Sequence, residues 1–155
     1  MSDLSFLLAP DAIDAKMSVA NKKALFQQLG LAAARRTGLP AKEIVACLTA
    51  RERLGSTGFG GGIALPHGKL AGLTRVFGYF ARLTAPVDFQ SVDTLPVDLV
   101  FLLLSPPDAG AEHLKALASV SRAFRDRETV AKLRGARSKD AIYALLGGAE
   151  TLHAA

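Results

Sequence analysis

The sequence predicts a single-domain α/β fold, in which a mixed β-sheet is flanked by helices on both faces. Three observations lead to this prediction. The chain has 155 residues, half of them hydrophobic, which suits one domain with a sizeable core. Segments with helical periodicity precede and follow two segments rich in β-branched and aromatic residues. The second of these strand-like segments is continuously apolar, which is typical of a central strand with helices on both faces.

Two helices are expected in the first third of the chain. Residues 20–36 carry alanine and leucine at helical spacing, with Ser18 as the expected cap and Gly38 as the expected end. A second helix is expected to begin at Pro40, because proline suits the first helical position, and to end at Gly55. One stripe of this second helix comprises Ile44, Cys47, Leu48 and Arg51.

The strands are expected in the middle of the chain and the remaining helices after it. Residues 74–83 and Val97 to Ser105 are the two strand-like segments, and Ile63 to Leu65 predicts a short third strand. Residues 110–125 predict a long helix capped by Asp108. Its apolar face is expected to comprise Leu114, Leu117, Val120 and Phe124. Two shorter helices are expected over residues 127–134 and 139–146.

Composition limits the classes of function. The formal net charge of +5 permits an acidic partner without requiring one. Cys47 is the only cysteine, which excludes an internal disulfide and suits a small core residue. The N-terminal apolar run from Phe6 to Ala9 is too short for a signal peptide, and the run from Leu99 to Leu104 is far too short for a membrane span. We therefore expect a cytoplasmic protein without membrane insertion.

The segment from Gly55 to Leu70 is rich in glycine and contains His67 directly after a proline. Gly68-Lys69 could end a P-loop, but a leucine follows where that motif needs a hydroxyl residue. Gly58-Phe59-Gly60 could open a dinucleotide-binding motif, but Ile63 stands where its third glycine belongs. No two histidines have the spacing of a zinc-binding helix. We therefore expect neither a nucleotide cofactor nor a metal.

A glycine run that contains a histidine suits phosphoryl transfer. Glycine lets the backbone approach a ligand and present concave N–H groups to an anion. A neutral imidazole is nucleophilic, so His67 could accept a phosphoryl group on one nitrogen while the other holds the ring proton. Positioning and charge stabilisation carry most of the catalysis of such a step. The expected donors to the phosphoryl oxygens belong to Ser56, Thr57, Gly58 and Gly68.

Arg51 and His113 each have two interpretations. Arg51 continues the inward stripe of its helix, so it could supply the cation that phosphoryl transfer needs, or it could complement the carbonyl end of that helix. His113 lies near the start of the 110–125 helix on the face of Val120 and Phe124, where a histidine is usually a core residue. Periodicity alone does not decide between the two roles of either residue.

The glycine segment resembles a known signature. Glu52, Phe59-Gly60 and Ile63-Ala64-Leu65-Pro66-His67-Gly68 are similar to the active-site signature of fructose/mannitol-type enzyme IIA domains of the bacterial phosphoenolpyruvate phosphotransferase system. The wider string, with Gly55-Ser56-Thr57-Gly58, is most similar to the nitrogen-regulatory (PtsN-like) branch, although Phe59 stands where an aliphatic residue is expected. The similarity spans residues 4–147, which we expect to form one enzyme IIA type-2 domain, with 148–155 as a tail.

The resemblance implies a role for each principal site residue. His67 matches the histidine that is phosphorylated at Nε2, Arg51 matches the arginine that steadies the phosphoryl group, and His113 matches a second active-site histidine. The family's donor is a small HPr-like phosphocarrier, which enzyme I and phosphoenolpyruvate charge, and no cofactor is implied. The implied function is a phosphohistidine carrier that regulates target proteins according to its phosphorylation state.

Two other functions are possible from the sequence. A sugar-specific, fructose-type enzyme IIA would use the same chemistry but pass its phosphoryl group to an enzyme IIB. A nucleic-acid-binding module is suggested by seven basic residues against two acidic ones between Arg122 and Lys139. A solvated basic face on two helices is the simpler interpretation, because no DNA-reading motif accompanies it. We therefore expect no nucleic-acid partner.

Overall fold

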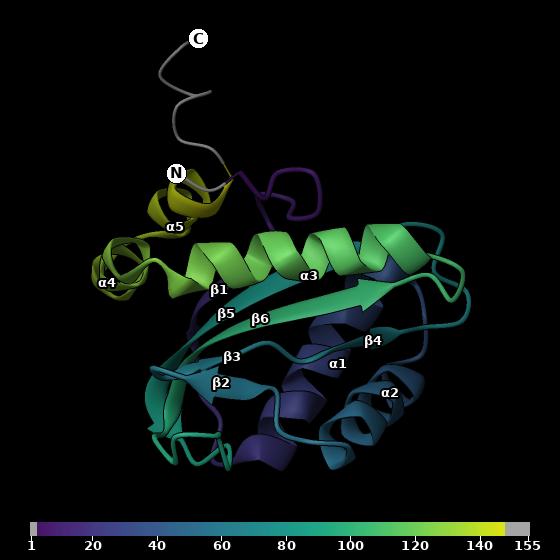
Figure 1. The fold of residues 1–155 in the computed structure, drawn as a ribbon, viewed down its shortest axis with the longest axis horizontal. Coiled ribbons are helices and arrows are strands. Elements are labelled where there is room, and N and C mark those ends of the chain that lie inside the picture. Colours follow the sequence, from purple (N-terminus) through teal and green to yellow (C-terminus); the bar gives the residue numbers. More distant parts are fainter. Residues whose placement is uncertain (1–2, 148–155) are drawn as a thin grey trace, which may run out of the picture.

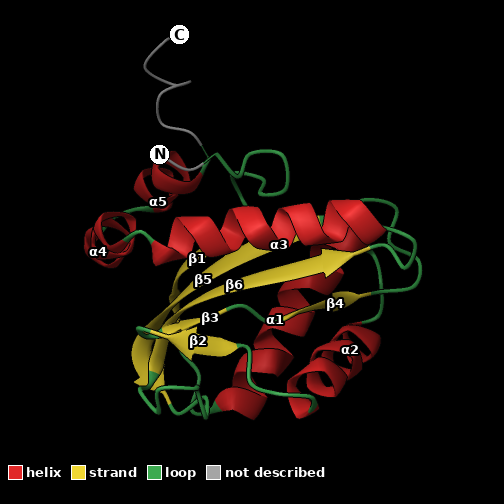
Figure 2. Ribbon diagram, in the orientation of Figure 1, coloured by secondary structure: helices red, strands yellow, loops and turns green. Residues whose placement is uncertain are grey.

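One six-stranded mixed β-sheet lies between two layers of helices in the computed structural model, which describes residues 3–147 (Figure 1). The strands are β1 (Ile13–Met17), β2 (Gly58–Gly60), β3 (Ile63–Ala64), β4 (His67–Lys69), β5 (Phe77–Val87) and β6 (Val97–Ser105). The helices are α1 (Lys22–Thr37), α2 (Ala41–Arg53), α3 (Gly110–Arg125), α4 (Arg127–Gly135) and α5 (Lys139–Leu146). Figure 2 shows α3 on one face of the sheet and α1 with α2 on the other, so the predicted fold class is confirmed.

β6 is the central strand of the sheet, as its continuous apolar run predicts. It pairs antiparallel with β5 on one side and parallel with β3 and β4 on the other, and only Asp98 among its residues is not buried. β3 pairs with Leu99 and Val100, whereas β4 pairs with Leu103 to Ser105. The glycine-rich segment therefore runs along the edge of the core strand, and this pairing fixes the position of His67 at the start of β4.

The helix that covers residues 22–37 begins later than its sequence suggests. Ser18 is not its cap, because Asn21 has the extended N-cap conformation and its side chain accepts a hydrogen bond from the Ala24 N–H at 2.8 Å. Asparagine is as good a cap as serine, and the closer residue satisfies the free amides of the first turn. The predicted end is confirmed, since Gly38 adopts the left-handed conformation with a φ of 76°.

Two further helix predictions are wrong and one is confirmed. Asp108 does not cap α3, whose N-cap is Ala109 without a side-chain hydrogen bond. The predicted end of α2 is confirmed, because Leu54 is its C-cap and Gly55 follows directly. Leu114 is 66% exposed, because the inward face of α3 is rotated away from it. None of the helices in residues 3–147 has both the length and the hydropathy that a membrane span needs.

Three strands carried no clear signal in the sequence. β2 and β4 are three residues each and consist largely of glycine and polar residues, and β1 holds polar residues among its apolar ones. β1 and β4 become strands by pairing with the longer β5 and β6, and β2 by pairing with β3, because a sheet satisfies the backbone hydrogen bonds of a segment that lies against it. The strand predicted over 74–83 is β5, which begins at Phe77 and extends to Val87. The predicted tail, 148–155, lies outside the described residues.

Candidate active site

His67 stands at the first position of β4 with its ring orientation fixed. Its Nδ1 lies 2.8 Å from the backbone oxygen of Leu65. A carbonyl oxygen only accepts hydrogen bonds, so Nδ1 must carry the ring proton and the neutral ring presents its lone pair at Nε2. Arg51 confirms this assignment, because its Nε–H donates to Nε2 of His67 at 3.2 Å. The backbone two residues before the histidine therefore selects the tautomer that leaves the lone pair on Nε2.

The surroundings of His67 keep its ring neutral. Burial lowers the pKa of His67 below its ordinary value of 6.5, because the charged form loses hydration. The hydrogen bond to Leu65 raises the pKa, the positive charge of Arg51 lowers it, and the negative charge of Glu52 raises it, with a net lowering. A neutral imidazole at pH 7 is the form that can attack phosphorus.

Arg51 occupies the last turn of α2 and makes two contacts. Its Nε–H reaches His67, and its Nη1–H donates to the backbone oxygen of Gly55 at 2.9 Å. One guanidinium therefore binds a carbonyl beyond the helix end and also contacts the histidine, and its role in phosphoryl transfer stays a prediction. The planar fork of guanidinium allows this division of donors, which a lysine could not reproduce.

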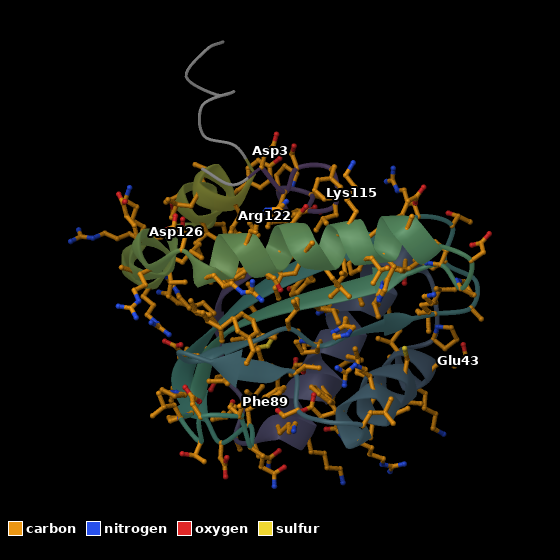
Figure 3. The ribbon with its side chains drawn as sticks, viewed as in Figure 1. Asp3, Glu43, Phe89, Lys115, Arg122 and Asp126 are labelled. Atoms are coloured by element: carbon orange, nitrogen blue, oxygen red, sulfur yellow. The ribbon has the colours of Figure 1, made fainter. Side chains whose placement is uncertain are left out.

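His113 lies in the first turn of α3 and faces the same site. Its ring centroid is 5.9 Å from that of His67, and only 9% of the residue is exposed. Figure 3 shows Lys115 and Arg122 projecting from the outer side of α3, opposite the sheet. Burial lowers the pKa of His113, and the nearby ionisable ring of His67 and the positive charge of Lys69 lower it further. His113 is thus both a buried residue and a neighbour of the His67 ring.

A carboxylate holds the loop between α2 and β2. Both oxygens of Glu52 accept the N–H of Thr57, at 3.1 and 3.2 Å, and the Thr57 hydroxyl donates to one of them at 2.6 Å. Lys22 on α1 pairs with the same carboxylate at 2.6 Å and also donates to the backbone oxygen of Phe89. The side chain of Glu52 is only 9% exposed, so this ion pair is largely shielded from water. Sequence reasoning missed Lys22, because its partner lies thirty residues away.

The donors predicted for phosphate are largely bonded within this loop. Both donors of Thr57 are held by Glu52, and the Gly58 N–H donates to the Ser56 hydroxyl at 3.1 Å. Ser56 in turn donates to the Phe89 oxygen at 3.4 Å. A side chain on Gly58 would collide with Ser91, so packing also explains this glycine. Phosphate binding by Ser56, Thr57 and Gly58 stays a prediction, and the loop's visible role is structural.

The glycine triplet that follows forms the β2–β3 hairpin turn. Gly60, Gly61 and Gly62 have φ angles of 112°, 67° and 81°, which other residues adopt only with strain. The Gly61 N–H donates to Asp93 at 2.9 Å, and its oxygen accepts from Arg134 at 2.7 Å. Arg134 also pairs with Asp98 at 2.8 Å, so one member of the basic run has a structural partner. Within residues 3–147, no cluster of three or more metal-ligating side chains is present.

Comparison with known proteins now decides the family. The family model of the phosphoenolpyruvate-dependent sugar phosphotransferase system, EIIA 2, matches residues 6–148. The chain belongs to this enzyme IIA family. It is 50% identical over 140 residues to a nitrogen regulatory protein of Bradyrhizobium diazoefficiens, covering 90% of this chain and 92% of the relative. It is 40% identical over 150 residues to a nitrogen regulatory protein of Pseudomonas aeruginosa, covering 94% and 96%.

Solved structures agree with this assignment. The nitrogen regulatory protein IIA-Ntr of Neisseria meningitidis superposes with a TM-score of 0.87 at 37% identity, covering 92% of this enzyme IIA and 97% of that chain. The mannitol IIA of Escherichia coli superposes with a TM-score of 0.72 at 20% identity, covering 88% and 96%, which shows the shared fold alone. The resemblance to the nitrogen-regulatory branch of the family, read from the glycine segment, is therefore confirmed.

The lowered pKa of His67 gives this enzyme IIA a testable pH behaviour. The folded ring should lose its proton at a pH below 6.5, so it is neutral where an ordinary histidine is half protonated. Since the unfolded chain binds this proton more readily than the folded protein does, His67 should lower the free energy of unfolding as pH falls from 6.5 through the folded pKa. An NMR titration of the His67 Cε1–H resonance measures this midpoint. A midpoint at or above 6.5 would contradict the expected net lowering and would mean that the Leu65 hydrogen bond and the Glu52 charge outweigh burial.

Gly68 follows His67 and lies directly under α2. A Cβ at this position would stand 2.5 Å from Sγ of Cys47, much closer than two such atoms approach. We therefore expect Gly68→Ala to lower the free energy of unfolding by about 1–3 kcal/mol through overpacking. Cys47→Ala in the same chain removes the colliding sulfur and should restore most of that loss. Urea unfolding of the two single variants and the double variant measures this coupling, and simple additivity would contradict it.

Proposed function

We propose that this enzyme IIA is a phosphohistidine carrier, which accepts a phosphoryl group from an HPr-like phosphocarrier on Nε2 of His67. The observation that carries the proposal is the arrangement of this ring between two fixed groups. Leu65 holds the proton on Nδ1, and the Nε–H of Arg51 lies 3.2 Å from Nε2, where a phosphoryl group would attach. A phosphoryl group bound at Nε2 would displace this contact and receive the guanidinium donors on its oxygens.

The transfer step is an in-line displacement between two imidazoles. The lone pair of Nε2 forms the new bond to phosphorus, and the bond to the donor's ring nitrogen breaks. His67 keeps its proton on Nδ1, so its ring carries a positive charge beside the phosphoryl oxygens while Leu65 accepts the hydrogen bond. Charge on the transferring group spreads over its equatorial oxygens. Stabilisation of that charge is proposed for Arg51, which donates to Nε2, and for His113, whose ring centroid lies 5.9 Å from that of His67.

The regulatory output is the second half of the proposal. The nitrogen regulatory names of relatives with 50% and 40% identity support a role in which phosphorylation of His67 changes binding to target proteins. The sugar-specific alternative remains chemically identical up to the phosphorylated state. Onward transfer to a fructose-type enzyme IIB would favour the sugar role, because a regulator needs no further acceptor.

Reconstitution with purified components tests the carrier function. The protein is incubated with radiolabelled phosphoenolpyruvate, enzyme I and the HPr-like donor. We expect one phosphoryl group per chain, labile in acid and stable in base as phosphohistidine is. Omission of the HPr-like donor should remove the label. Label that survives acid, or that forms equally well without the donor, would contradict the proposal. Adding a fructose-type enzyme IIB to the labelled protein then separates the two roles.

A further inference from the structure

A buried hydroxyl outside the predicted site contacts the second histidine. Ser105 is the last residue of β6 and has no exposed surface. Its Oγ lies 2.6 Å from Nδ1 of His113, which is in the first turn of α3. The only sequence signal for this residue is a polar side chain at the end of an apolar strand. Neither the resemblance nor the chemistry of His67 assigns it a role.

The environment of Ser105 decides which way this hydrogen bond runs. His113 is the single hydrogen-bond partner of the hydroxyl within residues 3–147. If Nδ1 of His113 were the donor, the hydroxyl hydrogen would be buried without an acceptor, at a cost comparable to a lost hydrogen bond. Ser105 therefore donates, and Nδ1 accepts. The neutral ring of His113 must then carry its proton on Nε2, the nitrogen on the other side of the ring.

The same strand pairing places both histidines. β4 and β6 pair in parallel, with His67 opposite Leu103 and Lys69 opposite Ser105. The Leu70 N–H donates to the backbone oxygen of Ser105 at 2.8 Å, which fixes the serine backbone to the end of β4. Ser105, whose hydroxyl contacts His113, is thus paired with Lys69, two residues after His67 in β4. The β4–β6 pairing therefore fixes His67 relative to the serine whose hydroxyl contacts His113, and the two histidine ring centroids lie 5.9 Å apart.

We propose that Ser105 is a positioning residue, whose hydroxyl holds His113 as the Nε2–H tautomer so that this N–H donates to the phosphoryl group on His67. This inference rests on the proposed carrier function. His67 and His113 then have opposite tautomers, each set by an oxygen on its Nδ1 side. The Leu65 oxygen accepts and leaves His67 a nucleophile, whereas the Ser105 hydroxyl donates and leaves His113 a hydrogen-bond donor.

Ser105→Ala and Ser105→Thr test this proposal, with Ser91→Ala as the matched control. The Ser91 hydroxyl is also buried, but it has no partner among the described residues, so its removal deletes the same atom without touching either histidine. Nitrogen-15 NMR of the unphosphorylated proteins reports the tautomer of His113. We expect the Nε2–H form in the wild type, Ser105→Thr and Ser91→Ala, and a mixture or a weakened Nδ1 hydrogen bond in Ser105→Ala.

Phosphoryl uptake from the HPr-like donor is measured on the same four proteins. We expect phosphoryl uptake to be about tenfold slower in Ser105→Ala, because losing one net hydrogen bond changes the population of the Nε2–H tautomer of His113 by about that factor. Uptake by the other variants should stay within about twofold of the wild type. An Nδ1–H tautomer in the wild type overturns the proposal, as does unchanged uptake in Ser105→Ala. If the wild type itself takes up no label, the carrier function fails, whereas the NMR result still decides whether Ser105 orients His113.

Discussion

Replacing His67 with alanine is expected to abolish phosphoryl uptake, by a factor of more than about 1,000 relative to the wild type. The proposed nucleophile is Nε2 of His67, whose lone pair accepts the Nε–H of Arg51 at 3.2 Å. Uptake is measured as acid-labile label after incubation with phosphoenolpyruvate, enzyme I and the HPr-like donor. His67→Gln is a second test, since its amide can still donate to the Leu65 oxygen while it offers no nucleophile.

The controls for His67 concern folding and the second histidine. Both variants should unfold cooperatively, because the residue is only partly buried and lies at a strand end. His113→Ala should retain uptake at a lower rate, since its ring is proposed to donate a hydrogen bond rather than to attack. Label on a folded His67→Ala protein, mapped to His113 by peptide mass spectrometry under basic conditions, would show that the nucleophile has been misassigned.

Replacing Arg51 with alanine should slow phosphoryl uptake by about 100-fold, the usual cost of removing one donor aimed at developing charge. The guanidinium is the cation that contacts His67, at 3.2 Å, and its second contact to Gly55 holds it in place. Arg51→Lys should restore part of the rate, because lysine keeps the charge but cannot divide planar donors between a ring nitrogen and a carbonyl. Single-turnover transfer from the phosphorylated donor measures both variants.

Arg53→Ala is the matched control for Arg51. It removes the same side chain two residues along α2, where the arginine is exposed, and it should leave the transfer rate within about twofold of the wild type. Equal losses in the two variants would mean that α2 contributes only general positive charge to donor docking. A wild-type rate in Arg51→Ala would remove the arginine from the mechanism altogether.

Local periodicity predicted the parts of the fold that hold the most buried apolar surface. The apolar run of β6 predicts a central strand, and Gly38 predicts the end of α1, because both signals lie within a few neighbouring residues. β2 and β4 escaped prediction, since their glycine and polar residues become strands only through pairing. Ser18 is not a cap because Asn21 takes that position beside the first turn of α1, and Asp108 is not a cap because α3 begins one residue later, with Ala109 as its N-cap.

The site was also predictable only in part, because several of its contacts join residues that are far apart in the sequence. The inward stripe of α2 and the apolar face of α3 direct Arg51 and His113 towards the sheet, and their contacts with the ring of His67 come from the β4–β6 pairing. Groups whose role is defined by distant partners carried no local signal. Lys22 depends on a carboxylate in the next helix, and Ser105 depends on a ring in the helix that follows it.

The most direct test of this account is to identify the nitrogen that carries phosphorus. Enzyme IIA labelled with nitrogen-15 in its histidine rings is phosphorylated through the HPr-like donor, and the coupling between phosphorus and nitrogen is measured by NMR. The geometry predicts coupling to Nε2 of His67, with the proton still on Nδ1 facing the Leu65 oxygen. Coupling to Nδ1 of His67, or to either nitrogen of His113, would contradict the claim that the Leu65 carbonyl selects the nucleophile.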